Sequence, residues 1–212
     1  EEKMQVLLVG APTALVTKYQ KVISASGLTL SSIETEILAI VRVLSYSGLP
    51  PTIILSIGAI STSLAIVKDN ILVFTYSIQT GGNAISRAIA ADFGLTMAQS
   101  EEYKKAYGFS KEGVGQKIGK STGLILNSLV AEAKKAIAFY SQKYRDDSLI
   151  QQILLSGGTA RLPGIDLFFA EHCGIETVIA NPWTILTQDQ QLSQDLRNKA
   201  SDYTVAIGLA MR

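Results

Sequence analysis

Two glycine-containing segments carry the residues of this sequence that are best suited to bind a small ligand. The first, Gly58–Thr62, reads GAIST and joins two apolar runs, so its backbone N–H groups and hydroxyls are available to an anion. In the second, Gly157, Gly158 and Thr159 follow an apolar run and precede a helical pattern. The missing side chains allow a ring or a ribose to approach the backbone closely. Either segment by itself is also typical of a tight turn without a ligand.

Other common chemistries lack the residues that they need. The sequence contains neither a G-x-x-x-x-G-K-[ST] phosphate loop nor a G-x-G-x-x-G fingerprint. His172, beside Cys173, is the single histidine, whereas a metal site needs three or four ligands and a serine hydrolase needs a base and a G-x-S-x-G elbow. We therefore expect no catalytic residue and no metal site. The lone cysteine excludes an internal disulfide and fits a reducing cytosol.

Composition narrows the class of protein. The chain has 212 residues, and 19 basic against 18 acidic side chains give a net charge of +1, which does not favour nucleic acid as the principal partner. The most apolar run, Ile53–Val67, is shorter than the roughly 20 residues of a membrane-spanning helix and is interrupted by Gly58, serines and Thr62. We expect a pair of strands there and no insertion of the chain into a membrane.

Helical and strand patterns alternate along the chain, which predicts an α/β fold. Thr96 with Gln99 predicts a capped helix start, and Asn83 is expected to cap the helix before it. The strands are expected in Met4–Pro12, in Leu28–Glu36, as three strands within Thr52–Thr80 with a turn at Asp69-Asn70, in Ile153–Ser156 and in Ile175–Pro182. The helices are expected in Thr13–Gly27, Glu36–Gly48, Gly81–Gly108 (two helices), Ser128–Tyr144, after Gly158, and in Tyr203–Met211.

The order of the motifs resembles the second half of actin-like nucleotide-binding proteins and, within that superfamily, the PilM family of type IV pilus assembly proteins. SIGAISTSLAIV, GGNAISRAIAADFG, SEEYKKAYG, LLSGGTARLPGI, ANPW and AIGLAMR follow one another in that order. The resemblance covers essentially the whole chain. It implies an α/β, actin-like (ribonuclease H-like) nucleotide-binding lobe with a helical insertion subdomain, plus a remnant of the first lobe.

The same resemblance implies a domain plan. The family's opening strand pair, which carries the first phosphate turn, has no counterpart, so we expect a fragment or a truncated version of the family's chain. The expected parts are a remnant of the first lobe (1–50), the second lobe IIA (51–83 and 149–201), the helical insertion IIB (84–148) and a C-terminal helix returning to the first lobe (202–212).

The first hairpin resembles the family's second phosphate turn, D-x-G-x-x-x-T. Gly58 and Thr62 match it, and the resemblance makes the residues between them possible N–H donors to phosphate. These are Ala59, Ile60 and Ser61. Ser56 stands where the family has the aspartate that holds hydrated Mg²⁺, and a hydroxyl is a poor replacement for that charge. We therefore expect hydrolysis to be slow or absent.

Two further motifs resemble the nucleoside site of the superfamily. Glu101 and Lys104 match E-x-x-K, one helical turn apart, which implies contacts to ribose and adenine. The alternative for this pair is a solvated ion pair on the helix surface. Gly157, Gly158 and Thr159 match the adenosine motif, whereas Gly81-Gly82-Asn83 is expected to serve helix entry rather than ligand contact.

The function implied by the resemblance is a cytoplasmic scaffold that binds ATP or ADP with Mg²⁺ and is recruited peripherally to the inner membrane. Its expected first partner is the N-terminal cytoplasmic peptide of PilN, followed by other inner-membrane pilus assembly proteins. An active ATPase or kinase of the superfamily, or an FtsA-like division protein, is the alternative, and Ser56 argues against enzymes that need a positioned metal. An actin-like fold that binds nothing is the third possibility.

Overall fold

The computed structural model describes residues 6–144, 149–185 and 193–212, which group into two compact units, Glu1–Thr35 and Glu36–Arg212. Within its described residues the first unit contains one regular element, the helix α1 (Thr13–Ala25), as predicted. The strands predicted in Met4–Pro12 and Leu28–Glu36 are wrong for the residues that the structure describes. Apolar runs become strands only when another strand satisfies their backbone groups, and no described strand pairs with these.

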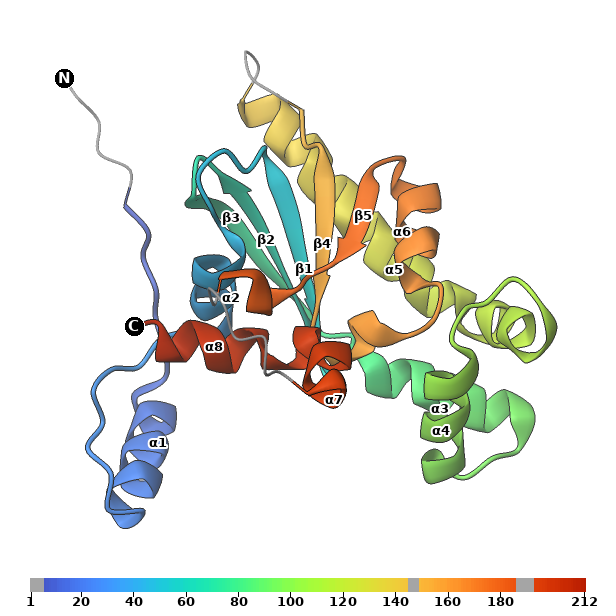
Figure 1. Cartoon of the computed structure of the whole chain (residues 1–212), viewed down its shortest axis with the longest axis horizontal. Coiled ribbons are helices and arrows are strands. Elements are labelled where there is room, and N and C mark those ends of the chain that lie inside the picture. Colours follow the sequence, from blue (N-terminus) through green and yellow to red (C-terminus); the bar gives the residue numbers. More distant parts are fainter. Residues whose placement is uncertain (1–5, 145–148, 186–192) are drawn as a thin grey trace. The chain divides into compact units, whose positions relative to one another are not determined.

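A five-stranded sheet forms the centre of the second unit (Figure 1). Its order is β3-β2-β1-β4-β5, in which the first three strands are antiparallel neighbours and β1, β4 and β5 run parallel. The strands are β1 (Thr52–Ile57), β2 (Thr62–Lys68), β3 (Ile71–Ile78), β4 (Gln152–Ser156) and β5 (Glu176–Ile179). The predicted antiparallel trio and the strands on either side of the helical region are confirmed.

Helices cover both faces of this sheet (Figure 1). Ile53, Leu55 and Ile57 of β1 point to one face, where α3 (Gly82–Phe93), α5 (Gly113–Lys143) and α6 (Ile165–Cys173) pack. Ile54 points to the opposite face, against α2 (Glu36–Leu44) and α8 (Thr204–Ala210). This alternation along β1 is the two-residue period of a strand that is buried on both faces.

Shorter elements connect the sheet to these helices. The helix α4 (Met97–Tyr107) begins with the predicted capping box, in which the Thr96 hydroxyl accepts from the Gln99 N–H and the Gln99 side chain accepts from the Thr96 N–H. The others are the 3₁₀ helices η1 (Gly158–Arg161), η2 (Pro182–Ile185) and η3 (Ala200–Tyr203) and the helix α7 (Gln194–Asn198). Among the residues described, no helix has both the length and the hydropathy to span a membrane.

Two details of the predicted helices are corrected. The helix predicted from Ser128 begins at Gly113, because Ile118 in its glycine-rich first half packs into the core. Glycine is required at position 115, where a β-carbon would collide with Ser110. The N-cap of α3 is Gly81 and not Asn83, whose N–H donates to a carbonyl of the β1–β2 turn.

The boundary near the start of the second unit falls at Glu36, so α2 groups with the sheet rather than with the preceding residues. Arg42 of α2 donates to the Gly208 carbonyl of α8 at 2.7 Å, and these two helices pack closely. The division into lobes IIA and IIB, with a first-lobe remnant over residues 1–50, stays a prediction.

Candidate nucleotide-binding site

A cavity of about 300 Å³ lies where the parallel strands β1 and β4 end. The carboxyl ends of neighbouring parallel strands are the usual place for a ligand in an open α/β sheet. Four segments that are far apart in the sequence meet there. The lining residues are Gly58, Ala59, Gly82, Asn83, Glu101, Lys104, Lys105, Gly158, Thr159, Arg161 and Leu162. All three motifs that the sequence singled out therefore contribute to one cavity.

The β1–β2 turn contributes its backbone to the cavity. The Gly58 N–H closes the turn by donating to the Ser61 carbonyl at 3.0 Å, and the carbonyls of Gly58 and Ala59 accept from the first N–H groups of α3 at 2.8 Å. Of the five residues predicted here, Gly58 and Ala59 line the cavity. Ile60, Ser61 and Thr62 do not: Ile60 is 75% exposed, and the buried Thr62 hydroxyl donates to the Thr80 carbonyl at 2.7 Å.

The glycine pair at the start of α3 allows that helix to touch the turn. A β-carbon on Gly81 would lie 2.6 Å from the Gly58 carbonyl oxygen, and one on Gly82 would lie 2.5 Å from the Thr159 hydroxyl. No residue larger than glycine fits either position without a shift of its neighbours. This geometry agrees with the predicted role of Gly81-Gly82 in helix entry, and it also places Gly82 in the cavity wall.

The side chain of Lys104 is buried, so its pair with Glu101 is not the solvated surface ion pair that was the alternative. Its ammonium donates to Glu101 Oε1 at 2.6 Å, to Ser86 Oγ at 2.7 Å and to the Gly82 carbonyl at 3.1 Å. These three bonds use all three ammonium hydrogens. Lys104 therefore fixes α4 against α3 and forms part of the cavity wall.

Glu101 is charged at neutral pH in this network. Partial burial pushes the pKa of Glu101 upward, but hydrogen bonds with Lys104 and Ser86 and the positive charges of Lys104 and Lys105 outweigh that effect. The net result is a pKa below the ordinary value of 4.5. Ser86 was not predicted, and its place one helical turn after Gly82 is the signal that the sequence offered. The structure shows that its hydroxyl is buried and donates to the Gly82 carbonyl at 3.0 Å.

The two glycines after β4 have different roles. Gly157 has φ +84°, and a β-carbon there would lie 2.6 Å from the Ile57 carbonyl oxygen, so this glycine packs β4 against the end of β1. It does not line the cavity. Around Gly158 the space is open, since a β-carbon there would meet only Asp202 Oδ1, at 3.6 Å. Gly158 and Thr159 are thus the residues of this motif that face the cavity.

Three polar residues of the cavity were not predicted: Asn83, Lys105 and Arg161. Asp202 holds the Arg161 guanidinium through two contacts, from Nε at 3.1 Å and from an outer nitrogen at 3.0 Å. This fork fixes the plane of the guanidinium. Arg161 stands two residues after the adenosine motif that the sequence singled out, and only the fold shows that it faces the same cavity as Lys105.

Ser56 lies near the end of β1, beside Ser63 of β2 and Ser156 of β4 in the sheet register. Ser56, which stands where the phosphate-turn motif of the family has aspartate, is therefore flanked by two further serines. The Ser156 hydroxyl donates to Thr204 Oγ1 at 3.0 Å. Within the described ranges, no three His, Cys, Asp or Glu side chains are grouped as metal ligands.

Comparison with solved structures shows the actin-like fold. The chain is similar to a PilM–PilN type IV pilus biogenesis complex (TM-score 0.78, 23% identity, 93% of this chain and 57% of that chain). It is also similar to the ethanolamine utilization protein EutJ from Carboxydothermus hydrogenoformans (TM-score 0.71, 20% identity, 95% of this chain and 62% of that chain). A third similar structure is MreB5 of Spiroplasma citri bound to AMPPNP (TM-score 0.65, 18% identity, 95% of this chain and 65% of that chain). The chain thus spans less than two thirds of the length of each of these proteins.

The α/β, actin-like fold predicted from the order of motifs is confirmed by these similarities. A family model described as type IV pilus assembly protein PilM matches residues 1–212. Since that match extends over the whole chain, this protein belongs to the PilM family of type IV pilus assembly proteins.

Proposed function

We propose that this chain binds an adenine nucleotide, ATP or ADP, in the cavity between β1, α3, α4 and η1, and that it acts as a scaffold in type IV pilus assembly. The observation that carries the proposal is the convergence of Gly58, Glu101, Lys104 and Gly158, from three separate motifs, on one cavity of about 300 Å³. That volume is at the lower end of the range for small-molecule sites. MreB5 of Spiroplasma citri, a protein of similar fold, has been solved in complex with AMPPNP and with ADP.

The chemistry of the wall supports a ligand with an anionic group. Lys104 has no ammonium hydrogen left for a ligand, so the cations that remain are Lys105, whose side chain is 67% exposed, and the oriented Arg161. The open space over Gly158 supplies room for a ring or sugar. Together these groups fit a molecule with a flat or compact part and a negative charge.

The cavity does not fit a Mg²⁺ ion held directly by this chain. Its one lining carboxylate, among the residues described, is Glu101, which is already bonded to Lys104 and Ser86. Magnesium in nucleotide sites is usually bound through one or two carboxylates together with phosphate oxygens and water. We therefore propose nucleotide binding with slow or absent turnover, and we assign no chemical step to the metal.

The scaffold role concerns docking of inner-membrane pilus proteins. One structural neighbour is a PilM–PilN complex, which supports PilN as a partner, and we propose the N-terminal cytoplasmic peptide of PilN as the docked segment. We propose that this contact lies on the first lobe, of which Met4–Tyr46 would be the part in this chain. Such docking would hold the protein at the cytoplasmic side of the inner membrane.

In a scaffold, the nucleotide needs only to stabilise the fold. A nucleotide that binds only the folded form stabilises it by about 2.7 kcal/mol at a hundredfold excess over Kd, without any hydrolysis.

Isothermal titration calorimetry with ATP and ADP tests the nucleotide proposal. Gly158→Arg should abolish binding, because the new side chain fills the open space next to Thr159. Gly119→Arg is the matched control: it makes the same change on α5, where a β-carbon would meet nothing within 4 Å, and it should bind as the wild type does. Equal affinity in all three proteins would remove Gly158 from the site.

Docking is tested by pull-down with the PilN N-terminal peptide, with and without nucleotide, alongside a phosphate-release assay. Peptide capture with little phosphate release is expected. Rapid ATP turnover without peptide capture would make the enzyme alternative the better one.

A further inference from the structure

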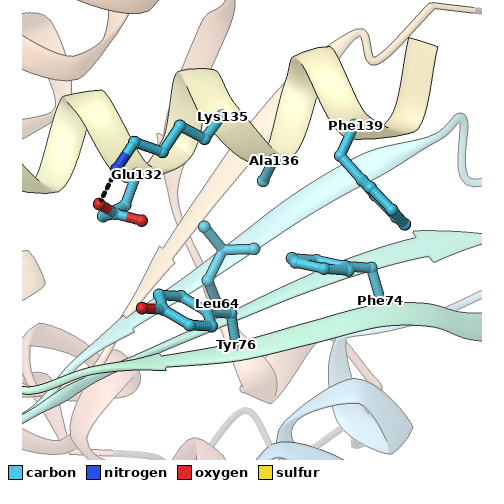
Figure 2. Close-up of a pocket in the computed structure, with 7 residues that line it drawn as sticks. All are labelled: Leu64, Phe74, Tyr76, Glu132, Lys135, Ala136 and Phe139. Carbon is cyan, nitrogen blue, oxygen red and sulfur yellow. Dashed lines mark hydrogen bonds and ion pairs between the residues drawn. The ribbon is translucent and has the colours of Figure 1, made fainter. Parts of the chain in front are cut away.

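A second cavity, of about 210 Å³, lies between strands β2 and β3 and the helix α5 (Figure 2). Its lining is mostly apolar and shares no residue with the nucleotide cavity. The residues are Leu64, Phe74, Tyr76, Glu132, Lys135, Ala136 and Phe139, which we call the β3 groove. The volume is below the range of ordinary small-molecule sites but suits a single large side chain. The groove is therefore better matched to a peptide than to a metabolite.

One wall of the β3 groove is the edge strand of the sheet. β3 pairs with β2 on one side and has no described strand on the other. Edge strands usually carry charges or proline that prevent pairing with another chain, yet Ile71–Ile78 contains neither. Its exposed apolar side chains include Ile71 and Tyr76, which are 59% and 50% exposed. An unprotected edge of this kind is suited to receive an added strand.

The opposite wall is a single stripe of α5. Glu132, Lys135, Ala136 and Phe139 recur at helical spacing. In Figure 2, Ala136 and Phe139 point toward the strands, and the Lys135 side chain extends along α5 to Glu132. The ring centres of Phe139 and Phe74 lie 4.8 Å apart, so the two rings are in contact, and Phe139 is still 41% exposed. The two walls therefore leave an aromatic surface that is only partly covered.

The charges beside the groove set the chemistry of an occupant. Lys135 is 71% exposed and pairs with Glu132, whose side chain is 24% exposed. The exposed Lys143 places its ammonium 5.8 Å from the ring centre of Phe139. Two exposed lysines thus accompany one partly covered glutamate on α5, and a carboxylate in the occupant complements them.

We propose that the β3 groove docks an extended segment of a partner protein. The segment pairs with β3 as a sixth strand, packs one aromatic or large aliphatic side chain against the contacting rings of Phe74 and Phe139, and places an acidic residue near Lys135 and Lys143. The unpaired backbone groups of β3 can hydrogen-bond only to an extended chain, and the volume of the groove holds one large side chain. The exposed lysines favour an acidic residue in the segment. The β3 groove shares no residue with the nucleotide cavity or with Met4–Tyr46, the segment proposed for the other peptide contact.

The test uses the whole chain and a synthetic peptide of about eight residues that alternates valine and threonine around one phenylalanine flanked by two glutamates. Amide chemical shifts should change on β3 and on the Glu132–Phe139 stretch of α5 when the peptide is added. Phe139→Lys should raise the Kd at least about tenfold, because it puts a charge into the apolar groove. Leu124→Lys is the matched control, since it changes another exposed apolar residue of α5, 88% exposed and outside the groove, and should leave the Kd unchanged.

Charge specificity is checked with Lys135→Glu, which should weaken binding of the glutamate peptide and favour a peptide with lysines in place of the glutamates. Thermal unfolding of each variant verifies that it is folded. Absence of shifts on β3, or equal Kd values for Phe139→Lys and Leu124→Lys, would overturn the proposal. Dimerisation of the chain alone through β3, seen by sedimentation and lost in Phe139→Lys, would instead assign the groove to a second copy and also overturn it.

Discussion

Gly82 and Thr159 lie so close that a β-carbon on Gly82 would sit 2.5 Å from the hydroxyl oxygen of Thr159. One residue begins α3 and the other belongs to η1, so this contact joins the helical region to the turn after β4. The same Gly82 carbonyl accepts from buried Lys104 of α4. The wall of the nucleotide cavity therefore depends on contacts that tolerate little change in volume.

Gly82→Ala should destabilise the protein by about 1–3 kcal/mol, because the added methyl group overpacks the contact with Thr159. Thr159→Ala in the same chain removes the colliding oxygen and should recover part of the loss, which a double-mutant cycle by urea unfolding measures. Gly119→Ala is the control, and its effect on stability should have the opposite sign. Its β-carbon meets open space inside α5, so it should stabilise by about 0.5–1 kcal/mol. Equal effects of both substitutions would contradict the close contact.

Lys104→Met should reduce stability by about 1–3 kcal/mol, because it leaves Ser86, Glu101 and the Gly82 carbonyl without their shared donor. Lys105→Met removes a lysine from the same helix whose side chain is 67% exposed and whose ammonium lies 4.0 Å from Glu101. That control should change stability by less than about 0.5 kcal/mol, as exposed pairs usually do. Urea unfolding of both variants decides whether the lysine is structural.

The contribution of Glu101 to stability should be lost in acid. Its pKa in the folded protein lies below the ordinary value of 4.5, so the stabilisation is present above pH 4.5 and disappears as the pH falls through the folded pKa. The stability difference between wild type and Glu101→Gln should therefore be largest near neutral pH and shrink in acid. Urea unfolding of the two proteins between about pH 7 and about pH 3 measures it. A difference that grows in acid would show that Glu101 is not held as a carboxylate.

Ser56→Asp should raise Mg²⁺-dependent phosphate release from ATP, because it supplies an oxygen ligand of the charge that hydrated Mg²⁺ prefers. Calorimetry should show that ATP still binds both proteins. Ser63→Asp places the same charge on the neighbouring strand in register with Ser56 and should not raise turnover. Rapid release by the wild type would show that the serine does not limit the reaction.

Local patterns predicted much of the fold. Short apolar runs and the turn residues Asp69-Asn70 predicted the three antiparallel strands correctly. In the structure both turn residues have positive φ. The Thr96–Gln99 capping box marked the start of α4. The patterns failed where formation of an element depends on distant partners. Residues 6–12 are apolar without a described strand beside them, and the glycine-rich start of α5 is helical because Ile118 and Leu126 pack into the core.

The sequence by itself determined the motifs, their order and hence the family and the α/β class, because these depend on residue types and local spacing. Only the tertiary structure decided which motif residues face the cavity. It turned Gly158 toward open space and Gly157 against β1, and it enclosed Lys104 between Ser86 and Glu101. It also brought Arg161 to the same wall. Spacing along a chain fixes a residue's place in its own element, whereas burial and hydrogen bonding depend on elements that pack against it from far away in the sequence.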